Sequence, residues 1–552
     1  MAATRGVRYE GASFSARSWR PLMVGLDRSS MHAHLVGGGI ASLAAAAILI
    51  RDGDMLGKNI TVYEQLDLLG GALDGSGNPE VGYLVRGGRM FESKYLCTYD
   101  LFSAIPTLDM RQTVTQEIFE WNEIIKTGSK ARLIRNGRRL VAPGFGLAEK
   151  EILMIERLIL TPESALGDSR ISDHFDAAFF RTNFWFMWAT TFAFQTWHSA
   201  VELRRYLIRF VHMVDGFNRL KGIMRTVYNQ YDSLVRPLRR WLEARNVQFS
   251  LRTRVDDIEF AERDGLRYAT ALRIERDGKS DRVALAASDF VIATLGSMTE
   301  GSALGMMDTA PILNDKQTGG TWRLWERIAE GRPELGRPKR FSERVSESKW
   351  LSFTVTQQTP ELLHHIRDLT GNVPGEGGLM TFCDSNWLMS IVVPHQPHFM
   401  SQPEDVQVFW GYALGMESPG NLVEKPIGEC TGREIMTELL AHLGVSDRAK
   451  AMMARTICLP CMMPFITSQF LTRAPGDRPA IRPAGYANFA VTGQFCELPD
   501  DVVFTVEYSV RSAMMAVYAL LGIERSPPAV FKGYHDLRSI VQAFRALHDL
   551  EQ

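Results

Sequence analysis

The pattern of apolar residues near the start of the chain changes from short runs to a helix-length segment. An apolar run at 34–36 leads through three glycines into a nearly continuous apolar segment at 40–50, and a further run at 60–63 ends at Glu64. Short runs are typical of buried strands, whereas the 40–50 segment is long enough for a buried helix. The order of strand, glycine turn, helix, strand and acid predicts the first βαβ unit of a dinucleotide-binding fold.

The glycine turn supplies the first candidate binding residues. Gly37, Gly39 and Ser42 stand at the three positions of the glycine fingerprint, with serine in place of the third glycine. Glycine lets the backbone approach a pyrophosphate closely, and the start of the next helix offers unpaired amide donors. Glu64 ends the second strand, where a carboxylate can accept the ribose hydroxyls. These residues predict nucleotide binding, although such a glycine pattern also occurs by accident.

Two later segments have the composition of further strands of the same sheet. Residues 289–296 and 488–493 are apolar runs that end in small residues and in Gly296 and Gly493. Ligands of doubly wound sheets bind beyond the carboxyl ends of the strands, so both glycines are expected to face the cofactor. The alternative for each is an ordinary turn after a strand. Together they predict an α/β fold with a Rossmann-like domain built from discontinuous pieces.

Aromatic residues are concentrated between Phe175 and Trp197, within a predicted helical region. They either line a tunnel for an acyl chain or form a packed helical core, and their spacing favours the core. A later block, residues 340–415, combines strand-like runs with loops. Its polar residues Asn386 and His395 are candidates for orienting a carboxylate, although most such groups satisfy buried backbone.

The segment from Val530 onward has apolar residues at helical spacing, with lysine and arginine between them. That pattern predicts an amphipathic helix. Such a helix either rests on a membrane surface or packs against its own domain.

The overall charge excludes one class of partner. Sixty-two basic residues stand against sixty-three acidic ones, so the chain lacks the positive field of nucleic-acid-binding proteins. Its six cysteines are too few for a disulfide framework and fit a reducing cytoplasm. Cys458 and Cys461 form a CxxC without a second pair nearby, which predicts no metal site. The arginine-containing arm at 1–30 lacks the apolar core of a secretory signal.

A set of motifs in a fixed order gives a resemblance to a known family. From about residue 30 to the C-terminus the chain resembles the oleate hydratases, once called myosin-cross-reactive antigens. The matching stretches are 37–42, 49–53, 70–75, 86–89, 103–106, 183–185, 197–201, 204–206, 228–233, 384–387, 396–399 and 507–509. A generic flavoprotein would not share this ordered set by chance.

The resemblance implies an FAD-binding, amine-oxidase-like core with a β-rich substrate domain and a helical lid. It also implies reversible hydration of an unsaturated long-chain fatty acid, typically oleate to 10-hydroxystearate, with FAD required but no net redox change. Hydration of an alkene needs a proton donor and an activated water, both held in a dry pocket. Family members are often homodimers, and either a monomer or a homodimer is expected here.

These patterns together suggest a division of the chain. The FAD-binding domain is expected to comprise 31–145, 246–340 and 421–525, the last with a helical segment. A helical substrate or lid region at 146–245 and a substrate-binding β region at 341–420 lie between these pieces. The arm at 1–30 precedes them, and the amphipathic helix at 526–552 follows.

The resemblance also assigns catalytic roles. Tyr206 matches the tyrosine that protonates the alkene, and nearby arginines are expected to favour the phenolate and so make the phenol a better donor. The family reads Arg-Gly-Gly-Arg-Glu-Met-Glu, with the first glutamate as the base, whereas this chain has Met90 in that place and Glu92 two residues later. Methionine cannot accept a proton. Either Glu92 swings in, or the flavin and backbone groups orient the water without a carboxylate, or the protein is slow or altered in its chemistry. The resemblance is to a methionine-variant subgroup of the family, so methionine here does not by itself imply loss of activity.

The remaining matches concern the ligands. The residues expected to contact the flavin are Gly70, Gly71, Arg86, Gly87, Gly88 and Arg89. Gln230 matches a residue near the substrate carboxylate. Two rival functions stay open: an FAD-dependent fatty-acid double-bond isomerase or oxidoreductase, and a non-catalytic protein that binds fatty acid and flavin. A cytoplasmic location is expected, with peripheral membrane contact through the C-terminal helix as an addition.

Overall fold

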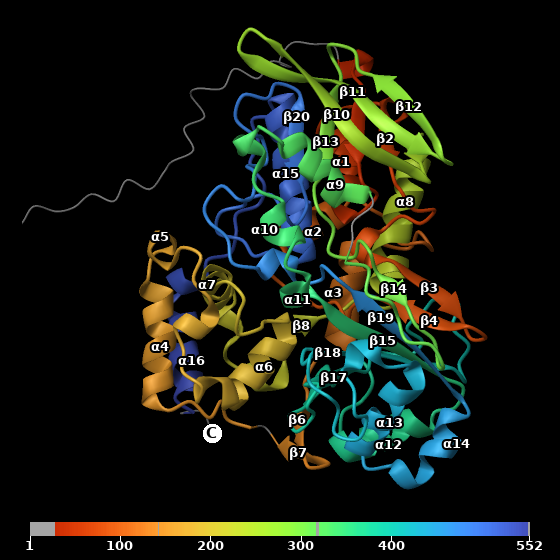
Figure 1. The fold of residues 1–552 in the computed structure, drawn as a ribbon, viewed down its shortest axis with the longest axis vertical. Coiled ribbons are helices and arrows are strands. Elements are labelled where there is room, and N and C mark those ends of the chain that lie inside the picture. Colours follow the sequence, from red (N-terminus) through yellow and green to blue (C-terminus); the bar gives the residue numbers. More distant parts are fainter. Residues whose placement is uncertain (1–27, 142, 316–318, 550–552) are drawn as a thin grey trace, which may run out of the picture.

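The computed structural model describes residues 28–141, 143–315 and 319–549, which form two large sheets and a helical lobe (Figure 1). The arm expected at 1–30 lies almost entirely outside the described residues.

The first large sheet is parallel, with the strand order β20-β13-β1-β2-β9. Its strands are β1 (Ala33–Val36), β2 (Ile60–Tyr63), β9 (Gln248–Ser250), β13 (Phe290–Thr294) and β20 (Phe489–Thr492). β1 pairs with β2 on one side and β13 on the other, and β13 pairs with β20. The predicted Rossmann-like sheet of discontinuous pieces is therefore confirmed.

Two helices pack on this sheet. Helix α1 (Ile40–Arg51) contacts β1, β2 and β13 as well as α15 (Val506–Leu521). A helix that is apolar on all sides must be buried, and the alanines of α1 let both neighbours approach it closely. A small antiparallel sheet of β10 (Thr253–Arg263), β11 (Leu266–Arg276) and β12 (Lys279–Ala284) lies beside the parallel sheet, at the top of Figure 1.

The second large sheet has eight strands in the order β14-β19-β15-β18-β17-β16-β6-β7. They are β6 (Ala131–Arg135), β7 (Arg138–Val141), β14 (Ala303–Leu304), β15 (Trp350–Gln357), β16 (Leu379–Phe382), β17 (Met389–Val392), β18 (Gln407–Ala413) and β19 (Thr456–Met463). The central strand β15 is buried at every position. This sheet forms the lower right of Figure 1.

The second sheet extends beyond the segment predicted for it. The substrate β region was expected at 341–420, whereas β6 and β7 precede residue 145, and β14 and β19 lie in other segments assigned to the FAD domain. β6 joins the sheet by parallel pairing of Leu133 with Thr381. This pairing links distant segments, so no local pattern in the sequence reveals it.

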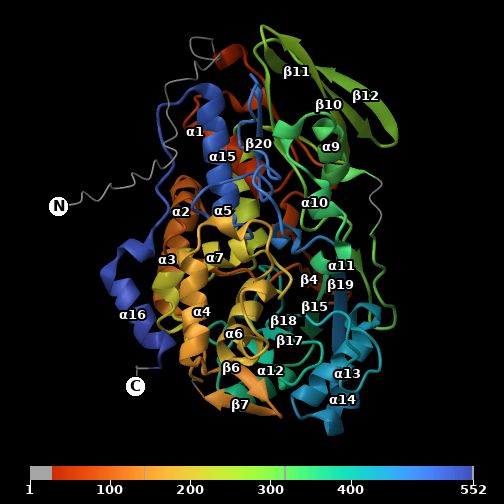
Figure 2. The same cartoon turned by 60° about the vertical axis from the view of Figure 1, so that its left-hand side comes forward.

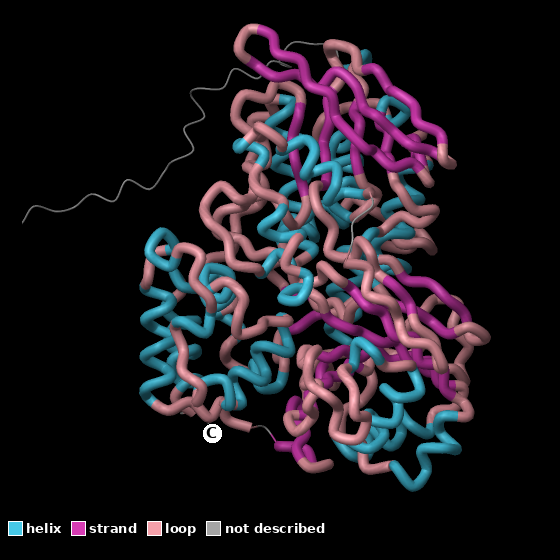
Figure 3. The backbone as a smooth tube through the Cα atoms, viewed as in Figure 1, coloured by secondary structure: helices cyan, strands magenta, loops and turns pink. Residues whose placement is uncertain are grey.

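A helical lobe stands beside both sheets and consists of helices and loops (Figures 2 and 3). Its helices include α4 (Glu149–Leu160), α6 (Asn183–Phe192), α7 (Ala200–Arg209) and α16 (Leu537–Leu547). In α6 the rings of Phe184, Trp188 and Phe192 follow one another at centroid distances of 5.4 and 4.9 Å. Most of the aromatic stretch is thus packed core, as its spacing favoured. Within the described ranges, no helix has the length and apolarity needed to cross a bilayer.

A buried carboxylate joins α15 to α2 (Leu96–Phe102). Glu507, in the first turn of α15, accepts hydrogen bonds from the backbone N–H groups of Cys97 and Thr98, each at 2.9 Å. It also pairs with Arg511 at 2.8 Å. The first backbone N–H groups of a helix have no hydrogen-bond acceptor within the helix. Glu507 supplies that acceptor and therefore caps the N-terminus of α2.

Replacing this carboxylate should destabilise the protein. Glu507→Ala is expected to lower the free energy of unfolding by about 3–5 kcal/mol, the usual cost of removing one partner from a buried ion pair. Urea unfolding followed by circular dichroism measures the change. Glu524 lies just beyond the same helix and is exposed, so Glu524→Ala should change stability by less than about 0.5 kcal/mol. Similar unfolding midpoints for both variants would contradict the anchoring role.

Candidate active site

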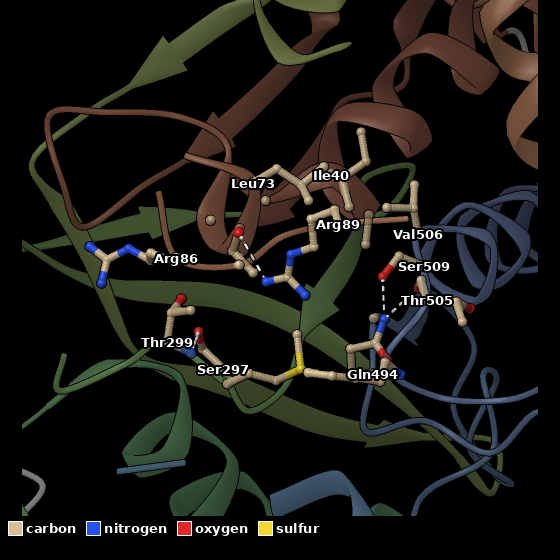
Figure 4. Close-up of a pocket in the computed structure, with 18 of the residues that line it drawn as sticks. Ile40, Leu73, Arg86, Arg89, Ser297, Thr299, Gln494, Thr505, Val506 and Ser509 are labelled. Atoms are coloured by element: carbon tan, nitrogen blue, oxygen red, sulfur yellow. Dashed lines mark hydrogen bonds between the residues drawn. The ribbon is translucent and has the colours of Figure 1, made fainter. Parts of the chain in front are cut away.

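A cavity of about 420 Å³ is lined by residues at the carboxyl ends of the parallel strands and by residues of the helical lobe. Figure 4 shows the part of it around Arg86, Arg89 and the start of α15. This volume falls within the range of small-molecule sites. Gly37 and Glu64 line one end, and Phe192, Tyr206 and Phe210 line the other. A single cavity therefore connects the predicted nucleotide residues with the predicted catalytic tyrosine.

The glycine turn leaves open space in front of α1. A Cβ at Gly38 would lie 2.7 Å from the Glu64 carboxylate, so this position is packed against the protein. A Cβ at Gly39 would meet nothing closer than the Cα of Gly71, at 3.9 Å. The free side of Gly39 therefore faces the cavity at the N-terminus of a helix, where a pyrophosphate fits. Gly70, Gly71, Gly296 and Gly493 also line this cavity.

Two predicted nucleotide residues have different surroundings. The Glu64 carboxylate accepts hydrogen bonds from the N–H groups of Gly38, at 2.7 Å, and Leu66, at 2.8 Å. Burial raises the pKa of Glu64, and these amide hydrogen bonds oppose that effect. Ser42 does not line the cavity: its hydroxyl lies 3.2 Å from that of Thr294 beneath α1. It holds the helix against the sheet, the packing role of the third glycine.

The loop at 86–89 crosses the middle of the cavity (Figure 4). Arg86 Nε donates to both oxygens of Asp74, at 2.8 and 2.9 Å. Arg89 Nη2 donates to the carbonyl oxygen of Ala72 at 3.1 Å. A Cβ at Gly88 would lie 3.0 Å from the ring of Trp410, so a larger residue here would require the ring to shift.

Tyr206 lies in an aromatic enclosure on α7. The ring centroids of Phe192 and Phe194 are each 5.0 Å from its own, and its hydroxyl donates to the carbonyl oxygen of Val503 at 2.5 Å. Burial raises the pKa of Tyr206 well above the usual value for tyrosine. The expected arginine effect is present, since the charge of Arg209 lowers this pKa, but burial outweighs it, so the phenol is not the stronger acid that was expected. Neighbouring Arg204 and Arg205 instead donate to the Ile159 carbonyl and the Glu163 carboxylate.

Met90 and Glu92 both line the cavity, and Glu92 is held firmly. Its Oε1 pairs with Arg209 Nη1 at 3.0 Å, and its Oε2 accepts from the backbone N–H of Lys94 at 2.6 Å and lies 3.5 Å from His212 Nε2. Burial acts to raise the pKa of Glu92, but the His212 contact and the Arg209 charge outweigh it and hold the pKa below its ordinary value. Glu92 is thus an ionised partner of Arg209 with both oxygens engaged.

A second, smaller cavity adjoins the first at the 86–89 loop. It has a volume of about 50 Å³ and is lined by Arg225, Gln230, His395 and His398. Both polar side-chain atoms of Gln230 lack a hydrogen-bond partner, as do Nε and Nη2 of Arg225. Burial lowers the pKa of Arg225 to about 10, so it stays cationic at neutral pH. Unpaired buried donors around a small cavity suit an anionic group.

Two sequence-based expectations differ from this arrangement. Asn386 is exposed, lies outside both cavities and donates to the carbonyl oxygen of Gly420, so its predicted place at the substrate was wrong. Arg225 was missed, and its only signal was a charge within the apolar run 223–227.

The CxxC pair lies along β19, where three residues span about 10 Å. That separation is too long for Cys458 and Cys461 to form a disulfide.

Comparisons with known proteins agree with this arrangement. A model of the MCRA family matches residues 30–518. An oleate hydratase from Streptococcus pyogenes is 40% identical over 537 residues, covering 95% of this chain and 90% of its own. A linoleate hydratase from Lactiplantibacillus plantarum is 33% identical over 535 residues, covering 89% and 93%.

Solved structures support the fold. A putrescine oxidase bound to putrescine has a TM-score of 0.50 at 12% identity, covering 89% of this chain and 99% of its own. Cyclohexylamine oxidase from Brevibacterium oxydans IH-35A has a TM-score of 0.50 at 13% identity, covering 90% and 100%. The amine-oxidase-like fold expected from the sequence is confirmed.

The open space at Gly39 can be tested directly. Gly39→Val should leave the fold intact, because no protein atom lies within 3.9 Å of the added Cβ, but should fill the space for a dinucleotide. Affinity for FAD, measured by fluorescence titration, is expected to fall at least about tenfold, or 1.4 kcal/mol. Gly128, where an added Cβ also meets open space, provides the matched Gly128→Val control. Unchanged FAD affinity in Gly39→Val would place the dinucleotide elsewhere.

Proposed function

The chain belongs to the MCRA family, and we propose that it is an FAD-dependent fatty acid hydratase. It adds water across the cis double bond of oleate or a related acid to give a 10-hydroxy fatty acid. Its relatives named oleate hydratase and linoleate hydratase support this reaction. The structural observation that carries the proposal is the single cavity joining a dinucleotide cradle to a buried tyrosine.

FAD fits the residues of the cradle. The glycine turn at 37–39 and the start of α1 would hold the pyrophosphate, Glu64 would accept the ribose hydroxyls, and the 86–89 loop would meet the ring system. Bound FAD supplies a rigid, largely apolar wall that organises the site without exchanging electrons with the substrate. This placement uses every predicted cofactor residue except Ser42, which acts from beneath α1.

Tyr206 is the proposed proton donor. Its hydroxyl faces an aromatic enclosure that excludes water, so the proton it releases can pass to an alkene carbon instead of to solvent. The raised pKa makes Tyr206 a weak acid in the resting site. The hydrogen bond to the Val503 carbonyl fixes the phenol until the alkene replaces that acceptor. The phenol then regains a proton originating from the attacking water.

Glu92 is the proposed water-side group. It lines the same end of the cavity as Tyr206, and its lowered pKa keeps it ionised at neutral pH. Because Arg209 and Lys94 fix both of its oxygens, Glu92 would polarise a water from its present position without swinging into the place of Met90. Glu92 would thus act as a weak, fixed proton acceptor in place of the glutamate that the family carries at the position of Met90.

The small cavity is the proposed position of the substrate carboxylate. Arg225 supplies the positive charge, and Gln230 and His395 supply polar contacts around it. A charged donor paired with a carboxylate is stronger than a neutral one, so the unpaired Nε and Nη2 of Arg225 would gain most from this ligand.

We further propose peripheral membrane contact through α16. Leu537, Ile540, Val541 and Phe544 expose between 43 and 73% of their surface on this helix, with Arg538 and Arg545 nearby. An apolar helical face flanked by cations suits an anionic bilayer. Co-flotation with anionic-lipid vesicles tests the contact, and failure to float with them would contradict it.

Loss of the phenol should stop hydration without removing the cofactor. Tyr206→Phe is expected to lower turnover of oleate by roughly a hundredfold or more, the scale of a lost acid–base group. The assay is incorporation of heavy oxygen from labelled water into hydroxy acid. Tyr508 provides a matched control, because its buried hydroxyl also donates to a carbonyl but does not line the cavity. A conjugated or oxidised product without the label would favour the isomerase or oxidoreductase. Binding of oleate without turnover would favour a non-catalytic role.

The departure at position 90 gives a gain-of-function test. Met90→Glu should raise turnover by up to about 10²-fold if the missing carboxylate limits the reaction, because general-base catalysis contributes on that scale. Met90→Gln has the same size without the charge and should give no gain. If Met90→Glu is no faster than wild type, the carboxylate is not what limits turnover, and Glu92 or the backbone positions the water adequately.

A further inference from the structure

Each turnover of a hydratase requires a proton to return to its donor. Tyr206 gives a proton to the alkene, and the attacking water releases one near Glu92, so the second proton has to reach the phenolate before the next cycle. Among the residues that the structure describes, no hydrogen bond joins Glu92 to Tyr206. Arg209 and Lys94 engage the oxygens of Glu92, while the phenol donates to the Val503 carbonyl. A third group is therefore needed to carry the proton through an enclosure that excludes water.

Tyr95 is a second phenol on the wall of the same cavity. It is the N-cap residue of α2, and its backbone N–H donates to the carbonyl oxygen of Glu92 at 3.3 Å. Only 6% of its surface is exposed. Its hydroxyl makes no hydrogen bond to the residues that the structure describes. A phenol both donates and accepts, so Tyr95 is able to take one proton and release another at the same oxygen.

The position of Arg209 relates Tyr95 to both ends of the proton path. Its guanidinium lies 5.9 Å from the ring centroid of Tyr95 and pairs with Glu92 at 3.0 Å. On the other side it lies 5.4 Å from the ring centroid of Phe210, which in turn is 5.5 Å from that of Tyr206. Tyr95 therefore shares its surroundings with the water-side carboxylate and with the proposed proton donor.

The mutual effects of these groups on their pKa values give the same order. Burial raises the pKa of Tyr95 well above its ordinary value, and the next largest effect comes from the charge of Glu92. Burial also raises the pKa of Tyr206, and there the next largest effect comes from Tyr95. Glu92 is not among the charges that act most strongly on Tyr206. Both phenols are therefore protonated at rest, with Tyr95 between the carboxylate and the donor.

Resting on the proposed hydratase function, we propose that Tyr95 returns the proton of the attacking water from Glu92 to Tyr206. The O–H bond of Tyr206 breaks as a C–H bond forms at one alkene carbon, and the water oxygen bonds to the other carbon. The proton that leaves the water passes by way of Glu92 to the Tyr95 oxygen, while the proton of Tyr95 passes to the Tyr206 oxygen. All three groups regain their starting protonation states, and only water and the alkene are consumed.

A neighbouring tyrosine on α2 provides a matched control. Tyr99 is as buried as Tyr95, and its hydroxyl donates to the carbonyl oxygen of Glu92 at 3.0 Å. It does not line the cavity. Its hydroxyl is thus close to Glu92 without lying on the path from the cavity water to Tyr206.

The test is Tyr95→Phe in the full chain with FAD, which removes the hydroxyl and keeps the ring. Turnover of saturating oleate should fall at least about tenfold, the lower range for a lost proton-transfer group, while the Michaelis constant and FAD affinity stay within about twofold of wild type. Wild-type turnover should fall along a curve as the fraction of heavy water rises, because several protons move in one step. Tyr95→Phe should give a straight line, and Tyr99→Phe should keep both the rate and the curve.

Two outcomes would overturn the relay. Unchanged turnover in Tyr95→Phe would show that the hydroxyl carries no proton, and slower turnover with the same curve would leave it only a role in positioning water. Wild-type protein that binds oleate and FAD without hydrating oleate would instead contradict the hydratase function itself. Tyr95→Leu removes the hydroxyl in a different shape, and whichever variant keeps the wild-type circular dichroism decides.

Discussion

The close approach of α1 to the parallel sheet is the constraint on which the rest of the site depends. The Ser42 hydroxyl meets Thr294 at 3.2 Å beneath the helix, and the alanines of α1 let α15 pack on its other side. Because α1 begins directly after the glycine turn, its N-terminus faces the same cavity as the N-terminus of α15. A bulkier residue at position 42 would push α1 outward, and the N-termini of α1 and α15 would then no longer face the cavity together. The site is therefore a consequence of how one helix packs.

A buried charge network holds the catalytic half of that cavity. Arg209, one turn beyond Tyr206 on α7, pairs with Glu92 and lies 3.6 Å from Asp501, which pairs in turn with Arg511. These pairs fix α7 against the segments that carry Glu92 and Asp501. Because each charge is matched within the network, the enclosure around Tyr206 stays apolar and dry. For Tyr206 as the proposed proton donor, a dry environment and a fixed position therefore matter more than acid strength in the resting site, since burial raises its pKa.

Local patterns predicted the elements well and the directions of side chains poorly. The βαβ unit, Gly37, Gly39, Gly296, Gly493 and Glu64 followed from local patterns, because the geometry of a strand, a tight turn and a helix is set by neighbouring residues. Gly70, Gly71, Gly87 and Gly88 were expected only from the family resemblance. The acidity of Tyr206 was predicted in the wrong direction, because burial outweighs the charge of Arg209, and burial depends on segments far along the chain. Arg205 pairs with Glu163. The direction of a side chain also explains the error at Asn386: its strand-and-loop block is present, but the side chain points outward. Arg225 was missed because local sequence does not show that its side chain points into a cavity.

The change at position 90 affects more than the activation of water. In the family pattern that this chain resembles, a glutamate directly follows the second arginine of the loop in the sequence. Here Met90 follows Arg89, Asp74 is engaged by Arg86, and Glu92 is engaged by Arg209. The loop of this chain therefore carries one carboxylate fewer than the family pattern, and no salt bridge to the buried Arg89 is present among the described residues. A site that has one negative side chain fewer can recover the charge balance from a negatively charged ligand.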